Sequence, residues 1–186
     1  MSQPSVEQLL AGCLRGESAA QTAFYGRFAP ELFGVCLRYA HSRADAQDIL
    51  QEGFIRVFER LGQYQGNGAL EGWLKRVLVT TAVNHYHNEL RYWQRNVELT
   101  DAAHVTADGN DALGQLSAAE LLALISQLPT GYRLVLNLYC VEGYSHAEIG
   151  EQLGIDERTS SSQLHKARRQ LQALVRRADQ SARIRP

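Results

Sequence analysis

The chain has 186 residues, of which 45% are hydrophobic and 21% charged, and its formal net charge is −1. This length allows one large domain or two small ones, and the composition is that of an ordinary globular protein. No apolar run is long enough to span a membrane, and residues 1–17 lack the basic and apolar regions of a signal peptide. We therefore expect no membrane insertion and a cytoplasmic location.

The three cysteines do not indicate a metal centre or a disulfide framework. Cys13, Cys36 and Cys140 lie far apart, and no Cys/His cluster has the spacing of zinc ligands. We expect all three to be small buried side chains, and we expect no metal and no cofactor. Few prolines and few β-branched runs predict an all-α chain rather than alternating strands and helices.

The charge is unevenly distributed along the chain. Residues 97–120 contain five carboxylates and no lysine or arginine, a net charge of −5. Residues 157–186 contain eight basic and two acidic side chains, a net charge of +6. A basic end of this kind indicates either a nucleic-acid partner or a solvated basic helix, and charge alone does not separate the two.

Apolar residues recur every three or four positions in the first half, which predicts helices. We expect these helices over residues 5–14, 18–40, 45–61 and 69–95, with Ser18 as the N-cap of the second. Two glycines and an asparagine predict a loop in the sequence QYQGNG that ends at residue 68.

One face of the third predicted helix is acidic. Asp45, Asp48 and Glu52 are three and four residues apart, so they share a face opposite the apolar stripe of that helix. Such a face is suited to a basic partner.

Residues 97–116 are acidic, polar and without periodicity, which predicts a flexible linker and a domain boundary. Two shorter helices are expected after it, over 117–127 and 130–141. Ser117 has the N-cap position of the first, with a glutamate three residues later, and Gly143 is the expected C-cap of the second.

The next segment has the pattern of a helix-turn-helix. Ser145 is placed to cap a short helix that Gly154 ends after two turns, and Asp156 is placed to cap a second helix. The small residue Gly150 allows the two helices to approach closely. The second helix exposes polar and basic residues that suit a DNA groove, whereas an ordinary helical hairpin would not need them. Those residues are Arg158, Ser161, Ser162, His165, Lys166 and Arg169.

This second half resembles region four of the bacterial extracytoplasmic-function (ECF) sigma factors. The similar segments are LP at 128–129, EGYS at 142–145, LGI at 153–155 and LHKAR at 164–168. In the first half, DAQDILQEGF at 45–54 resembles the polymerase-binding helix of region two, and WLKRV at 73–77 resembles its promoter-melting helix.

The resemblance implies an all-α fold of two small helical domains. Region two would occupy residues 1–96, the acidic linker 97–116 and the region-four helix-turn-helix 117–186. It implies a sigma factor that binds core RNA polymerase and directs it to promoter DNA, with no catalytic activity of its own. It also implies an anti-sigma factor as a regulatory partner.

The resemblance further assigns residues to three surfaces. The residues implied to form the polymerase-binding helix surface are Asp45, Asp48, Ile49, Gln51, Glu52 and Phe54, of which Phe54 is expected to pack inward. Those implied to contact the downstream (minus-ten) promoter element are Tyr64, Asn67, Trp73, Lys75 and Arg76. Those implied to contact the upstream (minus-thirty-five) element are Arg158, Thr159, Ser160, Ser161, Ser162, His165, Lys166, Arg168 and Arg169. Within the last set, Arg158 is the first choice for a guanine contact, and Lys166, Arg168 and Arg169 for phosphates.

Other interpretations stay open at the level of sequence. A stand-alone transcriptional regulator would share the helix-turn-helix and would need a ligand or receiver domain in the first half. A sigma-like protein that binds polymerase without melting DNA is suggested by Thr80 and Asn84, which stand where the family usually has Asn and Asp. An enzyme is disfavoured because no HExxH sequence, nucleophile elbow or phosphate loop occurs.

Overall fold

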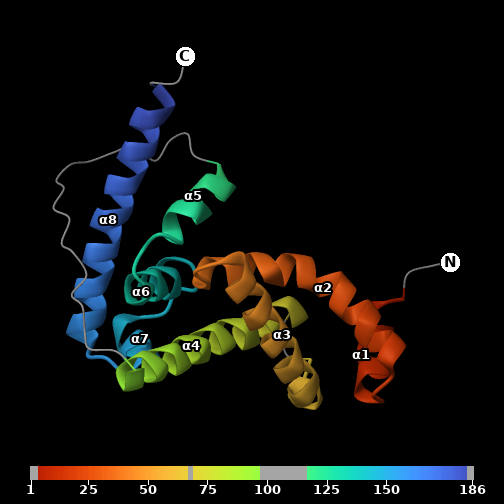
Figure 1. Cartoon of the computed structure of the whole chain (residues 1–186). Helices are drawn as coiled ribbons and strands as arrows, with labels where there is room; N and C mark the ends of the chain where they lie inside the picture. The colour runs from red at the N-terminus through yellow and green to blue at the C-terminus, as the bar shows by residue number, and fades with distance from the viewer. Residues whose placement is uncertain (1–3, 67–68, 97–116, 184–186) are drawn as a thin grey trace. The chain divides into compact units, whose positions relative to one another are not determined.

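A computed structural model describes residues 4–66, 69–96 and 117–183, and in these ranges the chain is helical and contains no strand (Figure 1). It forms two compact units, residues 1–85 and 86–186, and the division falls within the helix α4 (Leu70–Asn96). The predicted boundary at 97–116 lies outside the described residues and stays a prediction. Within the described ranges, no helix is both long and apolar enough to span a membrane.

The first unit contains three complete helices before α4. These are α1 (Val6–Leu14), α2 (Ser18–Tyr39) and α3 (Arg43–Arg60), and a short 3-10 helix, η1 (Leu61–Gln63), follows α3. The expected cap at Ser18 is wrong, because the N-cap of α2 is Glu17 and no side chain caps it.

Helix α3 begins two residues earlier than the sequence predicted, because Ser42 forms a capping box with Asp45. The Asp45 backbone N–H donates to Ser42 Oγ over 3.1 Å, and the Ser42 N–H donates to the Asp45 carboxylate over 3.0 Å. These two bonds satisfy donors that the first turn of a helix otherwise leaves unpaired.

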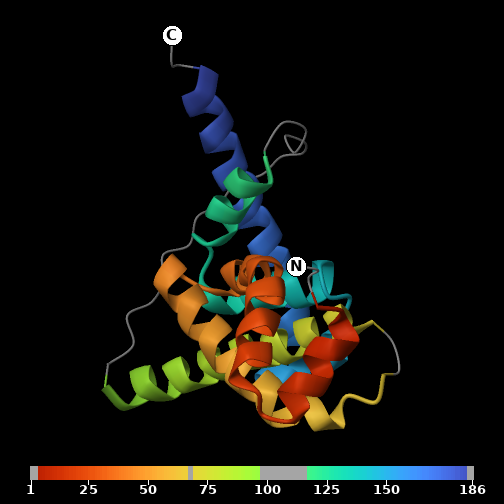
Figure 2. The same ribbon diagram turned by 90° about the vertical axis from the view of Figure 1, so that its right-hand side faces the viewer.

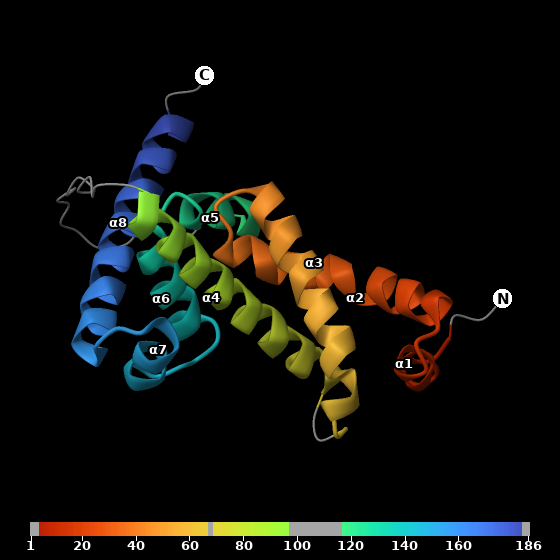
Figure 3. The same ribbon diagram turned by 60° about the horizontal axis from the view of Figure 1, so that its bottom comes forward.

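The core of the first unit lies between α2, α3 and the beginning of α4 (Figure 3). Phe24, Ile49 and Leu74, one from each helix, are at most 2% exposed. Helices α3 and α4 pack closely at Gly53, where an added Cβ atom would collide with the Leu78 side chain. The polar faces of all three helices are therefore turned outward.

The second unit contains α5 (Ala118–Ile125), α6 (Thr130–Cys140), α7 (His146–Leu153) and α8 (Glu157–Arg183). Helix α5 lies beside the C-terminal half of α8, which extends well past the helix-turn-helix (Figures 1 and 2). Ser117 forms the expected capping box with the glutamate three residues later, and Ser145, predicted only as an N-cap, forms one as well. The C-cap of α6 is Val141 instead of Gly143, although Gly143 has a positive φ of 80° in the following turn.

The buried side chain of Arg133 connects α6 to the turn after α5. Arg133 is 0% exposed, and its Nη1 donates to the Ser126 carbonyl oxygen over 2.9 Å. A buried cation needs such partners, and here backbone carbonyls supply them.

The cysteines only partly match the expectation of burial. Cys13 and Cys36 are buried, and desolvation raises the pKa of the Cys36 thiol to about 12. Cys140 is exposed, because it is the last residue of α6 and lies on the outer side of that helix turn.

The close packing at Gly53 leads to a stability prediction. We expect Gly53→Ala to lower the free energy of unfolding by about 1–3 kcal/mol, because the added methyl group overpacks the α3–α4 contact. Gly26→Ala is the matched control in α2, where a Cβ atom has nothing within 4 Å, and it should raise stability by about 0.5–1 kcal/mol. Urea unfolding measures both, and equal effects of the two substitutions would contradict the packing.

Candidate functional site

The residues predicted to bind polymerase divide into an exposed and a buried set. Asp48 and Gln51 are exposed, while Asp45 and Glu52 are half-buried. Glu52 accepts a hydrogen bond from the Arg56 guanidinium one turn later. Asp45 caps its own helix, so it has a structural role whether or not it also meets a partner.

Two members of that set cannot contact a partner directly. Ile49 and Phe54 are each 2% exposed, and the Phe54 ring packs 4.6 Å from the ring of Tyr25 in α2. The expectation that Ile49 belongs to the contact surface is therefore wrong. Phe54 packs inward as expected, and both residues hold α3 against the core.

Sequence reasoning missed an exposed apolar residue in α3. Ile55 is 59% exposed and lies four residues from both Gln51 and Glu59, which are also exposed. A signal was available, since Ile55 is apolar but falls outside the stripe that forms the core. The exposed face thus combines carboxylates with one large apolar side chain. We call Asp48, Gln51, Ile55 and Glu59 the α3 face.

The residues predicted for the downstream element lie where the loop after η1 enters α4. Tyr64 and Trp73 are half-buried, and their ring centres are 5.7 Å apart. Trp73 therefore keeps part of its side chain exposed. Arg76 is exposed, and Lys75 forms an ion pair of 2.9 Å with Glu31 of α2. Asn67 lies outside the described residues.

The helix-turn-helix has the tight turn that the sequence predicted. Gly154 has a φ of 66° and ends α7, and the Ile155 N–H donates to the Gly150 carbonyl oxygen over 3.0 Å. A Cβ atom at Gly150 would lie 2.7 Å from the Ile155 carbonyl oxygen. Only glycine fits this approach of helix to turn without a backbone shift.

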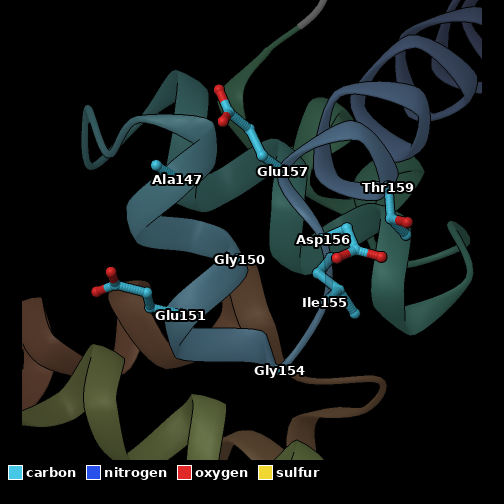
Figure 4. A pocket seen from close by; sticks show the side chains of 8 residues that line it. All are labelled: Ala147, Gly150, Glu151, Gly154, Ile155, Asp156, Glu157 and Thr159. Atoms are coloured by element: carbon cyan, nitrogen blue, oxygen red, sulfur yellow. The ribbon is translucent and has the colours of Figure 1, made fainter.

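A shallow hollow marks the outer side of this turn (Figure 4). Ala147, Gly150 and Glu151 line it from α7, and Asp156, Glu157 and Thr159 line it from the turn and the start of α8. Carboxylates therefore flank the N-terminal end of the recognition helix, where the helix dipole favours negative charge.

The second helix of the motif exposes most of the residues predicted to contact DNA. Arg169 is half-buried, and the exposed members are Arg158, Thr159, Ser161, Ser162, His165 and Lys166. We call these seven residues the α8 face. They lie opposite Leu164 and Ala167, which are at most 4% exposed and pack α8 against the unit. The side chains available to a partner are thus all polar or basic.

Two of the predicted DNA contacts take other positions. The assignment of Ser160 is wrong, because Ser160 is 0% exposed and its Oγ is hydrogen-bonded to His146 Nδ1 at 3.0 Å. Arg168 is exposed, but its guanidinium lies 5.8 Å from the ring centre of Tyr139 and donates to Cys140 Sγ over 3.6 Å. Arg168 is thus directed toward α6, away from the α8 face.

Two protein families match this chain, one in each half of the sequence. The family Sigma-70 region 2 matches residues 24–92, and the family Sigma-70, region 4 matches residues 118–171. Together they cover about two thirds of the chain.

Individual sigma factors from other bacteria are similar to this chain as well. The RNA polymerase sigma-H factor of Pseudomonas aeruginosa is 29% identical over 194 aligned residues, covering 96% of this chain and 100% of that protein. The ECF sigma factor SigE of Mycolicibacterium smegmatis is 31% identical over 151 residues, covering 77% of this chain and 56% of that protein. The ECF sigma factor SigW of Bacillus subtilis is 26% identical over 172 residues, covering 87% and 92%.

A solved structure shows the same fold. The sigma factor RpoE of Bartonella quintana, crystallised with the anti-sigma factor NepR, matches with a TM-score of 0.51 and 19% identity, covering 83% of this chain and 96% of that one.

Taken together, the helix-turn-helix, the acidic first-unit helix and these matches define a transcription initiation factor. The chain belongs to the ECF group of the sigma-70 family. Sigma factors are not enzymes, and this membership settles that the chain is not one. Because region two occupies the first half, the sigma-factor interpretation is favoured over the stand-alone regulator, which needed a ligand or receiver domain there.

The capping box of α7 leads to a prediction that depends on pH. Hydrogen bonds from the Ser145 backbone N–H and hydroxyl to its carboxylate lower the pKa of Glu148 below the ordinary value. Because the pKa is lowered in the folded state, the stabilisation is present above the ordinary carboxyl pKa and is lost as the pH falls through the folded value.

We expect Ser145→Ala to lower the free energy of unfolding by about 1 kcal/mol at neutral pH, as the loss of an N-cap usually does. The difference in the free energy of unfolding between Ser145→Ala and the unmodified chain should become smaller once Glu148 is protonated. Ser162→Ala, at an exposed position of α8, is the control and should change stability little. Thermal unfolding between neutral and acidic pH measures this, and a pH-independent difference would contradict the coupling.

Proposed function

We propose that this chain joins core RNA polymerase through the α3 face and directs it to promoters with a downstream and an upstream element. The observation that most supports this function is that the α8 face is polar and basic while the opposite side of α8 is buried. A helix held in this way presents base-reading and phosphate-binding side chains together, as the recognition helix of a helix-turn-helix does.

The α3 face supports a basic partner with an apolar contact at its centre. Asp48 and Glu59 supply negative charge, Gln51 supplies hydrogen bonds, and Ile55 supplies apolar surface. An apolar anchor within a polar rim is typical of protein interfaces. In this proposal Asp45 and Glu52 add to the charge of the face, while Ile49 and Phe54 keep α3 rigid from within.

The aromatic pair beside the loop supports binding of an unpaired base. Tyr64 and Trp73 are half-buried, so each keeps ring surface on which a base can stack. Arg76 is exposed and suited to a strand phosphate, whereas Lys75 must first leave Glu31. Asn67 is proposed for the same element from the sequence alone.

The α8 face supports contacts with the upstream element in duplex DNA. Arg158, in the first turn, is proposed to donate two hydrogen bonds to a guanine in the major groove. Thr159, Ser161, Ser162 and His165 would contribute further base or shape readout, and Lys166 and Arg169 would bind phosphates. Arg168 lies at the edge of this surface, with its guanidinium over the Tyr139 ring. It is proposed as a phosphate contact from that position.

Regulation and location follow from the same family membership. A solved relative is bound to an anti-sigma factor, and we extend this kind of partner to the present chain. A cytoplasmic location is part of the proposal, because core polymerase and promoter DNA are found there. Pull-down of this chain from native extract should return the subunits of core polymerase and, in addition, one further protein. Recovery of polymerase alone would contradict the anti-sigma assignment.

Run-off transcription tests the proposed function. Core polymerase free of other sigma factors is incubated with fragmented genomic DNA, with and without this chain, and RNA start sites are mapped. Discrete new start sites that share two spaced upstream elements are the expected result. If the chain binds core polymerase but produces no start sites, the alternative interpretation is correct: a sigma-like protein that does not melt DNA, as Thr80 and Asn84 suggested.

A charge reversal on the α3 face tests the polymerase contact. Asp48→Lys should weaken binding to core polymerase by about 1–2 kcal/mol, roughly tenfold, because it replaces an attraction by a repulsion. Glu7→Lys makes the same change at an exposed position of α1 and should leave core binding nearly unchanged. Fluorescence anisotropy of labelled chain with core polymerase measures both, and equal losses would show that only net charge matters.

A substitution in α8 tests the upstream readout. Arg158→Ala should weaken promoter binding by the holoenzyme by about 1–3 kcal/mol and relax the preference at one base position. Lys166→Ala is the comparison, and it should weaken binding evenly on all sequences and lower the salt dependence. A uniform loss for Arg158→Ala would instead make Arg158 a phosphate contact.

A further inference from the structure

A chain of contacts runs from the recognition helix through His146 to α6. His146 is the first residue of α7, and its Nδ1 is hydrogen-bonded at 3.0 Å to the buried hydroxyl of Ser160 in α8. On its other side the imidazole ring stacks on Tyr139 of α6, with ring centres 4.5 Å apart and planes inclined by 20°. The side chain of His146 thus connects α7 to both α6 and α8.

The same tyrosine is attached to α8 at a second point. The Arg168 guanidinium lies over the Tyr139 ring at 5.8 Å from its centre, as in a cation–π contact, and donates to the neighbouring Cys140 Sγ over 3.6 Å. Ser160 and Arg168 are eight residues apart, which is about 12 Å along a helix. Two attachments at that separation restrict both the tilt and the roll of α8.

We propose that His146 is a positioning residue that sets the orientation of the α8 face for reading DNA. The inference rests on the proposed function, since it concerns how that face is aimed. Ser160 is two residues from both Arg158 and Ser162 in the first turns of α8, so fixing the Ser160 hydroxyl fixes the direction of its neighbours. Recognition sites tolerate errors of only about 0.5 Å or 10–20° before contacts are lost.

Helix packing alone would leave this roll less defined. The buried neighbours of Ser160 on α8 are Leu164 and Ala167, whose apolar contacts are not directional. The hydrogen bond to His146 is directional, and a buried hydroxyl that loses its partner is unfavourable. The polar contact therefore selects one roll among those that the apolar side allows.

The test uses the full chain bound to core polymerase on a promoter found by run-off transcription. His146→Phe keeps a ring against Tyr139 but removes Nδ1, and Ser160→Ala removes the hydroxyl without adding bulk. Ser126→Ala is the matched control, since the Ser126 hydroxyl bonds only within its own helix, to the Ala123 carbonyl oxygen. The readout is the ratio of affinities for the intact upstream element and for single-base variants of it, with the melting temperature followed in parallel.

Each of His146→Phe and Ser160→Ala should lower the affinity ratio about three- to tenfold, the amount expected for one hydrogen bond. The double variant should lose no more than the larger single loss, because both remove the same contact. Non-specific DNA affinity and the Ser126→Ala ratio should not change.

Two outcomes would overturn the inference. A lower melting temperature with an unchanged affinity ratio would make His146 a purely structural residue, and additive losses in the double variant would show that the two residues act separately. A wild-type holoenzyme that does not discriminate at the upstream element would instead contradict the proposed function itself.

Discussion

The close approach at Gly150 is the constraint on which the DNA-binding part of this protein depends. Helix α7 has only eight residues, too few to be stable by itself, and it persists because both its ends are held. The Ser145–Glu148 capping box holds the first end, and the left-handed Gly154 with the Gly150–Ile155 contact holds the second. Because α7 is fixed, the position of the first turn of α8 is fixed as well. The orientation of the α8 face is determined by that first turn.

Charge is used differently in the two units. In the first, carboxylates on the α3 face stand beside an exposed isoleucine, an arrangement that suits a protein partner. In the second, the basic residues of the α8 face are gathered on a helix whose other side is buried, an arrangement that suits duplex DNA. The net charge of −1 conceals the basic C-terminal segment, because the acidic residues 97–120 nearly cancel the charge of residues 157–186.

The sequence predicted the helices well because most of them have a continuous apolar stripe, and the capping residues of α5 and α7 are local signals. It also predicted the tight turn, because only glycine is suited to positions 150 and 154. It failed at Ser160, because serine is mostly exposed in proteins and only the packed structure shows that this one is buried against His146. The prediction for Arg168 failed for a related reason. A long side chain at the edge of a helix face can point toward the partner or toward the neighbouring helix, and Arg168 points toward α6.

Other differences have the same origin. Ile49 falls between acidic residues in sequence, yet it lies in the core. Ile55 was overlooked because its one signal, an apolar side chain outside the core stripe, is not repeated along the helix. At the edges of an apolar stripe, the helical period alone does not show whether a residue is buried or exposed. Tertiary packing decides which of these residues face a partner.

In the proposed complex, the first unit contacts the downstream element while α8 reads the upstream element of the same promoter. Site-specific crosslinking tests this arrangement, with a photoreactive amino acid placed at Tyr64 in one variant and at Ser162 in another. In holoenzyme on a mapped promoter, we expect crosslinks from position 64 to the melted downstream strand and from position 162 to the upstream duplex. Crosslinks from both positions to one element, or from position 162 to polymerase alone, would contradict it.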